Sequence, residues 1–258
     1  MKYKGIILAG GAGTRLHPLT ISVSKQLLPV YDKPMIHYSV AQMLDFGIDE
    51  ILIITSSYEN VSLYSKLLSD VNAYFAYAVQ KTPCGIANAF HIGEHFIGGD
   101  NVCLMLGDNI FYGDLSNVRD SIYNTTRNLI LGIQVANPSA YGVMSFNDKC
   151  ALDKIVEKPE VPPSNYVVPG MYFFDNSVVD KAKTLVPSKR GEYEITDVIN
   201  LYLENEEDKM CYILMPPQTT WFDCGQIDDL LEASNFIAAI QKRTGKKVGD
   251  VYAKRIKQ

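Results

Sequence analysis

A glycine-rich stretch near the start of the chain has the residue types that phosphate binding needs. It follows a short apolar run that is typical of a buried strand. Gly10, Gly11 and Gly13 can adopt backbone conformations that other residues avoid, and they let backbone N–H groups close on an anion. Arg15 and Lys25 add two positive charges suited to phosphate oxygens. The stretch therefore predicts a phosphate-binding loop rather than a plain strand-to-helix turn.

Two better-known phosphate-binding loops do not fit this stretch. The dinucleotide fingerprint GxGxxG would need a glycine where the chain has Leu16, and an acidic residue near Thr55 at the end of the next strand. The GxxxxGK[ST] pattern does not match either, because Gly13 is followed by Thr14 and Arg15. The loop belongs to neither class.

The order of motifs along the chain resembles the sugar-1-phosphate nucleotidyltransferases, also called sugar-nucleotide pyrophosphorylases. The loop reads GGAGTRLHPLT and is followed, after four residues, by KQLLP. Further blocks that match the family in order are VYDKPMI from Val30, LGDNIFYG from Leu106, YGV from Tyr141, EKP from Glu157, GEYEITD from Gly191 and WFDCG from Trp221. The resemblance extends over roughly residues 3–245 and is far more specific than one loop.

The resemblance implies a Mg²⁺-dependent enzyme that condenses dTTP with glucose-1-phosphate to give dTDP-glucose and pyrophosphate. Such a reaction is an in-line attack on the α-phosphorus, so it needs positioning and charge neutralisation more than an enzyme nucleophile. The same chemistry with UTP or CTP and another sugar phosphate stays open, because Cys84 stands where the family usually carries Asp.

Two more remote alternatives are a glycosyltransferase that consumes a nucleotide sugar and a non-catalytic nucleotide-sugar sensor. Glycosyltransferases of similar fold commonly use an Asp-x-Asp metal motif, and the chain has no second Asp after Asp108-Asn-Ile. A sensor is expected to have lost Arg15, Lys25 or an aspartate, and the sequence retains them. Both observations favour the nucleotidyltransferase.

Two aspartates match the metal-binding positions of the family. Asp108 follows an apolar strand, and Asp223 precedes a predicted helix. The spacing of two residues so far apart proves nothing by itself. The resemblance implies that these hard carboxylates, together with substrate phosphates and water, hold Mg²⁺.

The same resemblance assigns three catalytic cations. Arg15 would hold the β- and γ-phosphates, and Lys25 would neutralise the α-phosphate and the departing pyrophosphate. Lys158, in the EKP block, would grip the sugar phosphate and place its oxygen in line.

Further residues are assigned to the two substrates by resemblance. The nucleotide-binding set is Leu8, Gly10, Gly11, Gly13, Thr14, Gln80, Gly85 and Asp108. The sugar-binding set is Asn109, Gly142, Glu157, Val168 and Tyr172. Within these sets, Gln80 can both donate to and accept from a base edge, and Glu157 can accept hydrogen bonds from two hydroxyls.

Alternating strands and helices predict an α/β fold with a Rossmann-like, mixed, mostly parallel sheet and helices on both faces. In such sheets ligands bind at the carboxyl ends of the strands, where the glycine loop and the GDN motif lie. The expected strands are 4–9, 50–56, 74–79, 101–106 and 129–135, and the expected helices lie near 34–46, 59–69, 85–96 and 114–126.

The chain is expected to be a single nucleotidyltransferase domain, residues 1–258. Its nucleotide-binding part is 1–135, a sugar-binding insertion is 140–225, and a C-terminal helix and tail are 226–258. The second and third parts are expected to contain strands at 141–146, 151–157 and 166–174, and helices at 176–185, 194–205 and 226–243.

The charge and the composition of the chain restrict the classes of partner that it is expected to have. A net charge of −5 argues against nucleic acid, and the chain has no apolar stretch long enough to span a membrane. Five scattered cysteines predict a reducing, cytoplasmic location. The expected partners are a nucleoside triphosphate, a sugar-1-phosphate and further copies of the chain in a homo-oligomer such as a dimer. The chain ends earlier than long members of the family, which leaves their regulatory nucleotide site in doubt.

Overall fold

The computed structural model describes residues 2–124, 128–205 and 210–255. The chain divides into two compact units, each built from several segments. The first unit consists of Lys4–Pro83, Met105–Gly113 and Thr220–Gln258, and the second consists of Met1–Tyr3, Cys84–Leu104 and Asp114–Thr219. The single-domain organisation expected from the sequence stays a prediction.

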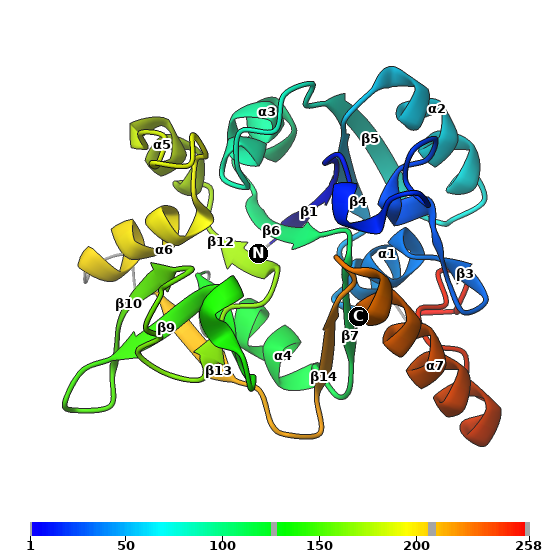
Figure 1. The fold of residues 1–258 in the computed structure, drawn as a ribbon. Helices are drawn as coiled ribbons and strands as arrows, with labels where there is room; N and C mark the ends of the chain where they lie inside the picture. The colour runs from blue at the N-terminus through cyan, green and yellow to red at the C-terminus, as the bar shows by residue number, and fades with distance from the viewer. Residues whose placement is uncertain (1, 125–127, 206–209, 256–258) are drawn as a thin grey trace. The chain divides into compact units, whose positions relative to one another are not determined.

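A parallel sheet forms the centre of the first unit. Its strands are β1 (Tyr3–Ala9), β4 (Glu50–Thr55) and β5 (Tyr74–Val79), in the order β1-β4-β5. Helices α1 (Ile36–Asp45) and α2 (Tyr58–Leu67) supply the crossovers that parallel neighbours require (Figure 1). Strands β1 and β4 are rich in Ile and Leu, and β5 consists of aromatic residues, Ala and Val. All three form near-continuous apolar runs, as buried parallel strands do.

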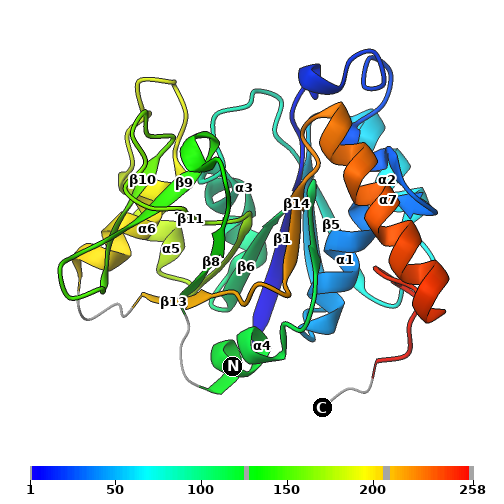
Figure 2. The ribbon, with the colours of Figure 1, turned by 60° about the horizontal axis from the view of Figure 1, so that its bottom comes forward.

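Shorter strands and a long helix complete the first unit. The antiparallel pairs are β2 (Pro29–Val30) with β3 (Lys33–Pro34), and β7 (Asn109–Tyr112) with β14 (Thr220–Asp223). Helix α7 (Ile227–Thr244) packs on β14 and α1 through a shared core that includes Tyr38, Phe222 and Ile237 (Figure 2). Strand β14 therefore pairs with β7 and is covered by α7.

The second unit has a larger, mixed sheet in the order β10-β9-β11-β8-β12-β6, with β13 paired to β8. Its strands are β6 (Asn101–Leu106), which continues into the first unit, β8 (Leu129–Gln134), β9 (Gly142–Phe146), β10 (Leu152–Glu157), β11 (Tyr166–Val167), β12 (Met171–Phe174) and β13 (Cys211–Leu214). Its helices are α3 (Asn88–Ile97), α4 (Ser116–Asn124), α5 (Val178–Thr184) and α6 (Ile195–Glu204). The antiparallel pairs are β10 with β9, β9 with β11, and β8 with β11 and β12.

The predicted α/β fold with a Rossmann-like mixed sheet and helices is confirmed. One expected strand, over 166–174, is wrong: it is two strands, β11 and β12. Pro169 lies between them and has no N–H to donate to a strand ladder. The expected helix near 114–126 is α4, and residues 125 and 126 lie outside the described part of the chain. Strands β2, β3, β7, β13 and β14 were not expected.

No helix in the part of the chain that the structure describes is both long and apolar enough to cross a membrane.

Candidate active site

Asp108 and Asp223 lie next to each other in the first unit. Asp108 directly precedes β7, and Asp223 is the last residue of β14. The antiparallel register places Asp223 opposite Asn109, and the Cys224 N–H donates to the Asp108 carbonyl oxygen at 2.9 Å. Pairing of two short strands thus brings together two carboxylates that are far apart in the sequence.

The electrostatics of this pair suit a divalent cation. Burial and the nearby Asp108 carboxylate raise the pKa of Asp223 to about 6, against the opposing influence of Lys25 and Arg15. Two like charges that are shielded from water, one buried and one half-buried, repel each other, and a divalent cation bound to their oxygens would remove that repulsion. The donor set therefore fits a hard metal ion.

The protein would supply only part of the coordination of such an ion. No cluster of three or more His, Cys, Asp or Glu side chains able to hold a metal occurs among the described residues. A magnesium ion usually keeps several waters and takes one or two protein carboxylates together with substrate phosphates. Asp108 and Asp223 match that pattern.

Burial of the Asp223 carboxylate, together with its repulsion from Asp108, predicts a gain in stability when Asp223 is neutralised. The raised pKa of Asp223 means that the folded protein binds more protons than the unfolded one between pH 3.8 and about 6, so stability falls as the pH rises through that range. In EDTA at pH 8, Asp223→Asn is expected to stabilise the metal-free protein by up to roughly 3 kcal/mol. Thermal unfolding at pH 8 and at pH 4 measures this. The gain should vanish at pH 4, and a variant less stable than the parent at pH 8 would refute the raised pKa of Asp223.

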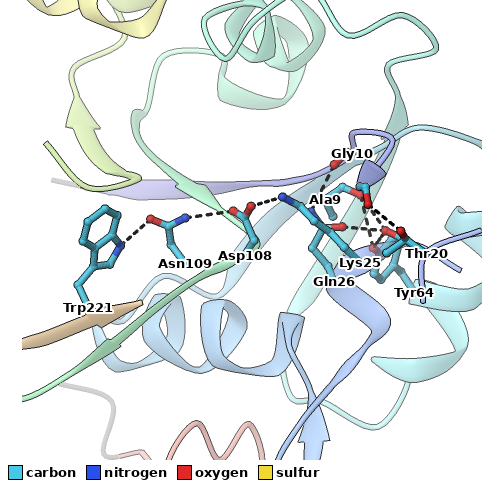
Figure 3. Close-up of polar contacts among 11 residues, drawn as sticks. Ala9, Gly10, Thr20, Lys25, Gln26, Tyr64, Asp108, Asn109 and Trp221 are labelled. Atoms are coloured by element: carbon cyan, nitrogen blue, oxygen red, sulfur yellow. Dashed lines mark hydrogen bonds and ion pairs between the residues drawn. The ribbon is translucent and has the colours of Figure 1, made fainter. Parts of the chain in front are cut away.

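Lys25 faces the carboxylate pair from the glycine-loop segment. It begins a short 3₁₀ helix and donates from Nζ to Asp108 Oδ2 (Figure 3). Its side chain is largely buried, so its charge acts in a medium of lower dielectric than water. Lys25 thus lies beside the carboxylate pair, and its role toward the phosphates stays a prediction.

Two hydrogen bonds fasten the Lys25 segment to the glycine loop. Gln26 is buried and donates from Nε2 to the Gly10 carbonyl oxygen at 3.3 Å, and Thr20 donates from Oγ1 to the Gly13 carbonyl oxygen at 2.7 Å (Figure 3). Gly13 has a φ of 59°, in the left-handed region that favours glycine. The two hydrogen bonds hold the loop against the Lys25 segment, and its contact with phosphate stays a prediction.

The remaining nucleotide-binding predictions in the first unit lie along the same sheet. Leu8 is in β1, and Gln80 directly follows β5 and donates its N–H to the Thr55 carbonyl oxygen at the end of β4. Gly10 and Gln80 therefore lie at the carboxyl edge of three parallel strands. Thr14 and Arg15 are exposed on the loop. Their contacts with a nucleotide stay predictions.

The second unit brings together most of the predicted sugar site. Gly142 and Glu157 face each other across β9 and β10, and the Val168 N–H donates to the Gly142 carbonyl oxygen at 2.9 Å. A Cβ on Gly142 would lie 2.8 Å from the methyl carbon of Thr196 and 3.6 Å from Glu157 Oε2. Glycine at this position keeps space beside the carboxylate. Tyr172, by contrast, is buried on β12 opposite Ile130.

Lys158 and Arg190 add positive charge next to Glu157. Lys158 Nζ lies 3.7 Å from Glu157 Oε1, and its backbone has a φ of 42°, which is unusual outside glycine and typical of functional sites. Arg190 Nη1 donates to Glu157 Oε1 at 3.0 Å, and Nη2 donates to Glu192 Oε2 at 2.6 Å. Arg190 was missed at the sequence level, although it directly precedes the GEYEITD block that pointed to this region.

Position 85 requires a glycine, because two backbone segments of the second unit approach each other closely there. Tyr193 donates its N–H to the Cys84 carbonyl oxygen at 2.8 Å and accepts from the Ala87 N–H at 3.1 Å. Gly85 lies inside this clamp with a φ of 102°, and a Cβ there would stand 2.3 Å from the Tyr193 carbonyl oxygen. Only glycine fits, and helix α3 consequently starts after the predicted position, at Asn88.

Gly85→Ala is expected to open the clamp and raise the KM for the nucleotide by about 10- to 100-fold, because the backbone strain and the clash together cost on the order of 1–3 kcal/mol. Steady-state kinetics with each substrate varied in turn measures the effect, and the KM for the sugar phosphate should change less. Gly99→Ala is the matched control, since a Cβ at Gly99 meets no atom within 4 Å. Equal behaviour of the two variants would contradict the assignment.

Asn109 is buried and hydrogen-bonded to two side chains of the first unit. The Trp221 indole Nε1 donates to Asn109 Oδ1 at 2.7 Å, and Asn109 Nδ2 donates to Asp108 Oδ1 at 3.0 Å (Figure 3). The predicted contact of Asn109 with the sugar is untested by this geometry. Trp221 was quoted only as part of a motif, and its link to Asn109 could not be read from the sequence.

Comparisons with known proteins agree with the geometry. A family model described as nucleotidyl transferase matches residues 4–240. A glucose-1-phosphate thymidylyltransferase of Mycolicibacterium smegmatis is 47% identical over 250 residues, which cover 95% of this chain and 86% of the relative. A protein of the same name from Neisseria meningitidis is 46% identical over 243 residues, which cover 92% of this chain and 83% of the relative.

Two solved structures share the fold. A Bacillus anthracis protein described as a glucose-1-phosphate thymidylyltransferase, solved with sucrose, superposes with a TM-score of 0.81 at 36% identity over 91% of this chain and 94% of its own. A UDP-glucose pyrophosphorylase solved with UDP-glucose superposes with a TM-score of 0.79 at 26% identity, over 94% of this chain and 100% of its own. The region that the family model matches contains every site residue predicted from the sequence.

Proposed function

The chain belongs to the nucleotidyl transferase family, and from this we propose that it condenses dTTP with glucose-1-phosphate to give dTDP-glucose and pyrophosphate. One observation carries the proposal: the buried carboxylate of Asp108 and the half-buried carboxylate of Asp223 lie together beside the cationic Lys25 in the first unit. Relatives named glucose-1-phosphate thymidylyltransferase, at about 45% identity, support the choice of substrates.

In the proposed reaction a phosphate oxygen of the sugar phosphate attacks the α-phosphorus of dTTP. The bond from that phosphorus to the β-phosphate oxygen breaks, and pyrophosphate leaves with the electron pair. A Mg²⁺ ion held by Asp108 and Asp223 would screen the phosphate charges when bound. Both reactants are anions, so the residues around them act chiefly by positioning and by neutralising charge.

The cations of the first unit supply that neutralisation for the nucleotide. Lys25 keeps its ammonium beside Asp108, where it can neutralise the α-phosphate and the leaving pyrophosphate. Arg15 is exposed on the glycine loop and can reach the β- and γ-phosphates. Gly11 and Gly13 both have positive φ, and their backbone N–H groups can add neutral donors for a phosphate.

The cluster around Glu157 in the second unit supplies the binding groups for a sugar phosphate. Lys158 can grip the phosphate, and Arg190 adds a planar cation suited to the same group. Glu157 can accept hydrogen bonds from sugar hydroxyls while Gly142 keeps space beside it.

A pyrophosphate-release assay tests the proposal. The protein is incubated with Mg²⁺ and each pairing of dTTP, UTP or CTP with glucose-1-phosphate or another hexose-1-phosphate. The proposal predicts the highest kcat/KM with dTTP and glucose-1-phosphate, and no release when the sugar phosphate is left out. Preference for another pair would replace the substrates and keep the chemistry. Absence of release with every pair would leave only the sensor or the glycosyltransferase.

We further propose that the enzyme works in the cytoplasm as a homo-oligomer such as a dimer. No two cysteines form a disulfide among the described residues, which suits a reducing compartment. Light scattering of the purified protein measures the number of copies in the assembly.

A further inference from the structure

We propose that Trp221 is a positioning residue for the metal-binding carboxylate of Asp108, and that it acts through the side-chain amide of Asn109. The inference rests on the proposed metal site and adds a residue that the motif comparison did not assign. It concerns three side chains of the first unit that lie in one row (Figure 3).

The row is built by the register of two strands. In the β7–β14 pair, Trp221 lies opposite Phe111 and Asp223 lies opposite Asn109. Trp221, Asp223 and Asn109 therefore belong to one short ladder that Asp108 directly precedes. Helix α7 packs against this ladder through Phe222. Because the ladder sets the spacing between Trp221 and Asn109, the hydrogen bond between their side chains does not depend on the conformation of a loop.

The indole settles which way the Asn109 amide points. An indole N–H can only donate, so the group that faces it at 2.7 Å must be the amide oxygen, Oδ1. The amide NH₂ then faces the other way and donates to Asp108 Oδ1 at 3.0 Å. Turning the amide by half a revolution would set an oxygen against the carboxylate and an NH₂ against the indole N–H. Trp221 thus selects the one orientation in which Asn109 stabilises the carboxylate.

Asp108 is consequently held on both of its oxygens. Asn109 occupies Oδ1, and Lys25 donates to Oδ2 from the opposite side. The backbone of Asp108 is fixed as well, because its carbonyl oxygen accepts from the Cys224 N–H. A carboxylate fixed in this way loses less rotational freedom when it binds a cation, and removing such supporting hydrogen bonds typically weakens metal binding by about 10- to 100-fold.

Trp221 also supplies a direct spectroscopic readout. It is the single tryptophan of the chain, so the intrinsic tryptophan fluorescence of the protein comes from this residue alone. If its N–H is coupled to the Asp108 carboxylate through Asn109, binding of Mg²⁺ at Asp108 should change that emission. The same titration of Asp108→Asn should give no change.

The decisive experiment measures binding of Mn²⁺ alone, by electron paramagnetic resonance, to the protein without substrates. Trp221→Phe keeps an aromatic ring and removes the N–H, and we expect its Kd for Mn²⁺ to rise about 10- to 100-fold. Asn109→Ala should show a similar rise. The double variant should bind no more weakly than Asn109→Ala, since the two residues act in series.

Tyr112→Phe is the matched control, because it removes one polar group, a hydroxyl, from an aromatic residue of the same strand pair. It should bind Mn²⁺ like the parent. Wild-type affinity in Trp221→Phe, or additive losses in the double variant, would overturn the inference. The fluorescence titration decides the matter independently if a variant does not fold, since unchanged emission of the parent protein on Mg²⁺ binding would also overturn it.

The outcomes separate this inference from the proposed function. Pyrophosphate release by the parent protein tests the function without involving Trp221. An active parent whose Trp221→Phe variant binds Mn²⁺ normally refutes the positioning role alone. In an active Trp221→Phe variant, the Mg²⁺ concentration for half-maximal rate should rise more than kcat falls.

Discussion

Asp108→Asn is expected to lower kcat for pyrophosphate release by at least about 10³-fold. The substitution removes a charge that would bind the cation and that also pairs with Lys25. An asparagine has one side-chain oxygen, whereas Asp108 accepts from Asn109 on one oxygen and from Lys25 on the other. The variant must therefore turn an NH₂ group toward one of these two donors.

Turnover at saturating dTTP, glucose-1-phosphate and Mg²⁺ measures the effect of this substitution. Asp70→Asn is a suitable control, because Asp70 is an exposed acid of the same unit and should keep parental activity. An Asp108→Asn enzyme that keeps more than about a tenth of the parental rate would rule out a central role for this carboxylate.

Lys25→Ala is expected to reduce kcat by about 10²- to 10³-fold. Lys25 lies within the site and opposes the mutual repulsion of the two carboxylates, and its influence lowers the pKa of Asp223. Without it, neither the leaving pyrophosphate nor the carboxylate pair has that compensating charge. A cation that stabilises charge formed in the transition state should affect kcat more than KM.

Steady-state kinetics at several Mg²⁺ concentrations separates the two parameters for Lys25→Ala. Lys66→Ala serves as the control, since Lys66 is exposed on α2 of the same unit. A rise in KM with unchanged kcat would mean that Lys25 binds substrate and transition state equally, which is contrary to the proposed role.

Local sequence patterns were sufficient for the parallel part of the fold. The apolar runs that became β1, β4 and β5 are bounded by polar residues, and their length alone favours buried strands. Glycines and cations in one contiguous loop also gave a direct indication of phosphate chemistry. These features depend on residues that are close in the sequence, so a local pattern is enough to detect them.

The pairing of β7 with β14 could not be predicted in this way. Each strand has four residues, and more than one hundred residues separate them along the chain. Nothing in either segment alone specifies its partner, yet this pairing is what places Asp223 next to Asp108. Family resemblance named the two aspartates, and only the register of the strands supplies a physical reason for their proximity.

The contacts of single side chains were the least predictable. Gly85 was assigned to the nucleotide by resemblance, but its need for glycine comes from the distant Tyr193 backbone. Arg190 and Trp221 lie beside or inside quoted motifs, and their partners Glu157 and Asn109 are far away in the sequence. A sequence can show which residues are chemically capable, whereas orientation follows from tertiary packing.

The central claim is that Asp108 and Asp223 together hold one divalent cation at the nucleotide phosphates. A crystal structure with Mn²⁺ and a non-hydrolysable dTTP analogue tests it most directly, through the anomalous scattering of manganese. The account predicts one peak bonded to an oxygen of each carboxylate, at about 2.1 Å, and to phosphate oxygens. A manganese ion bound to the phosphates alone, with Asp223 outside bonding distance, would contradict it.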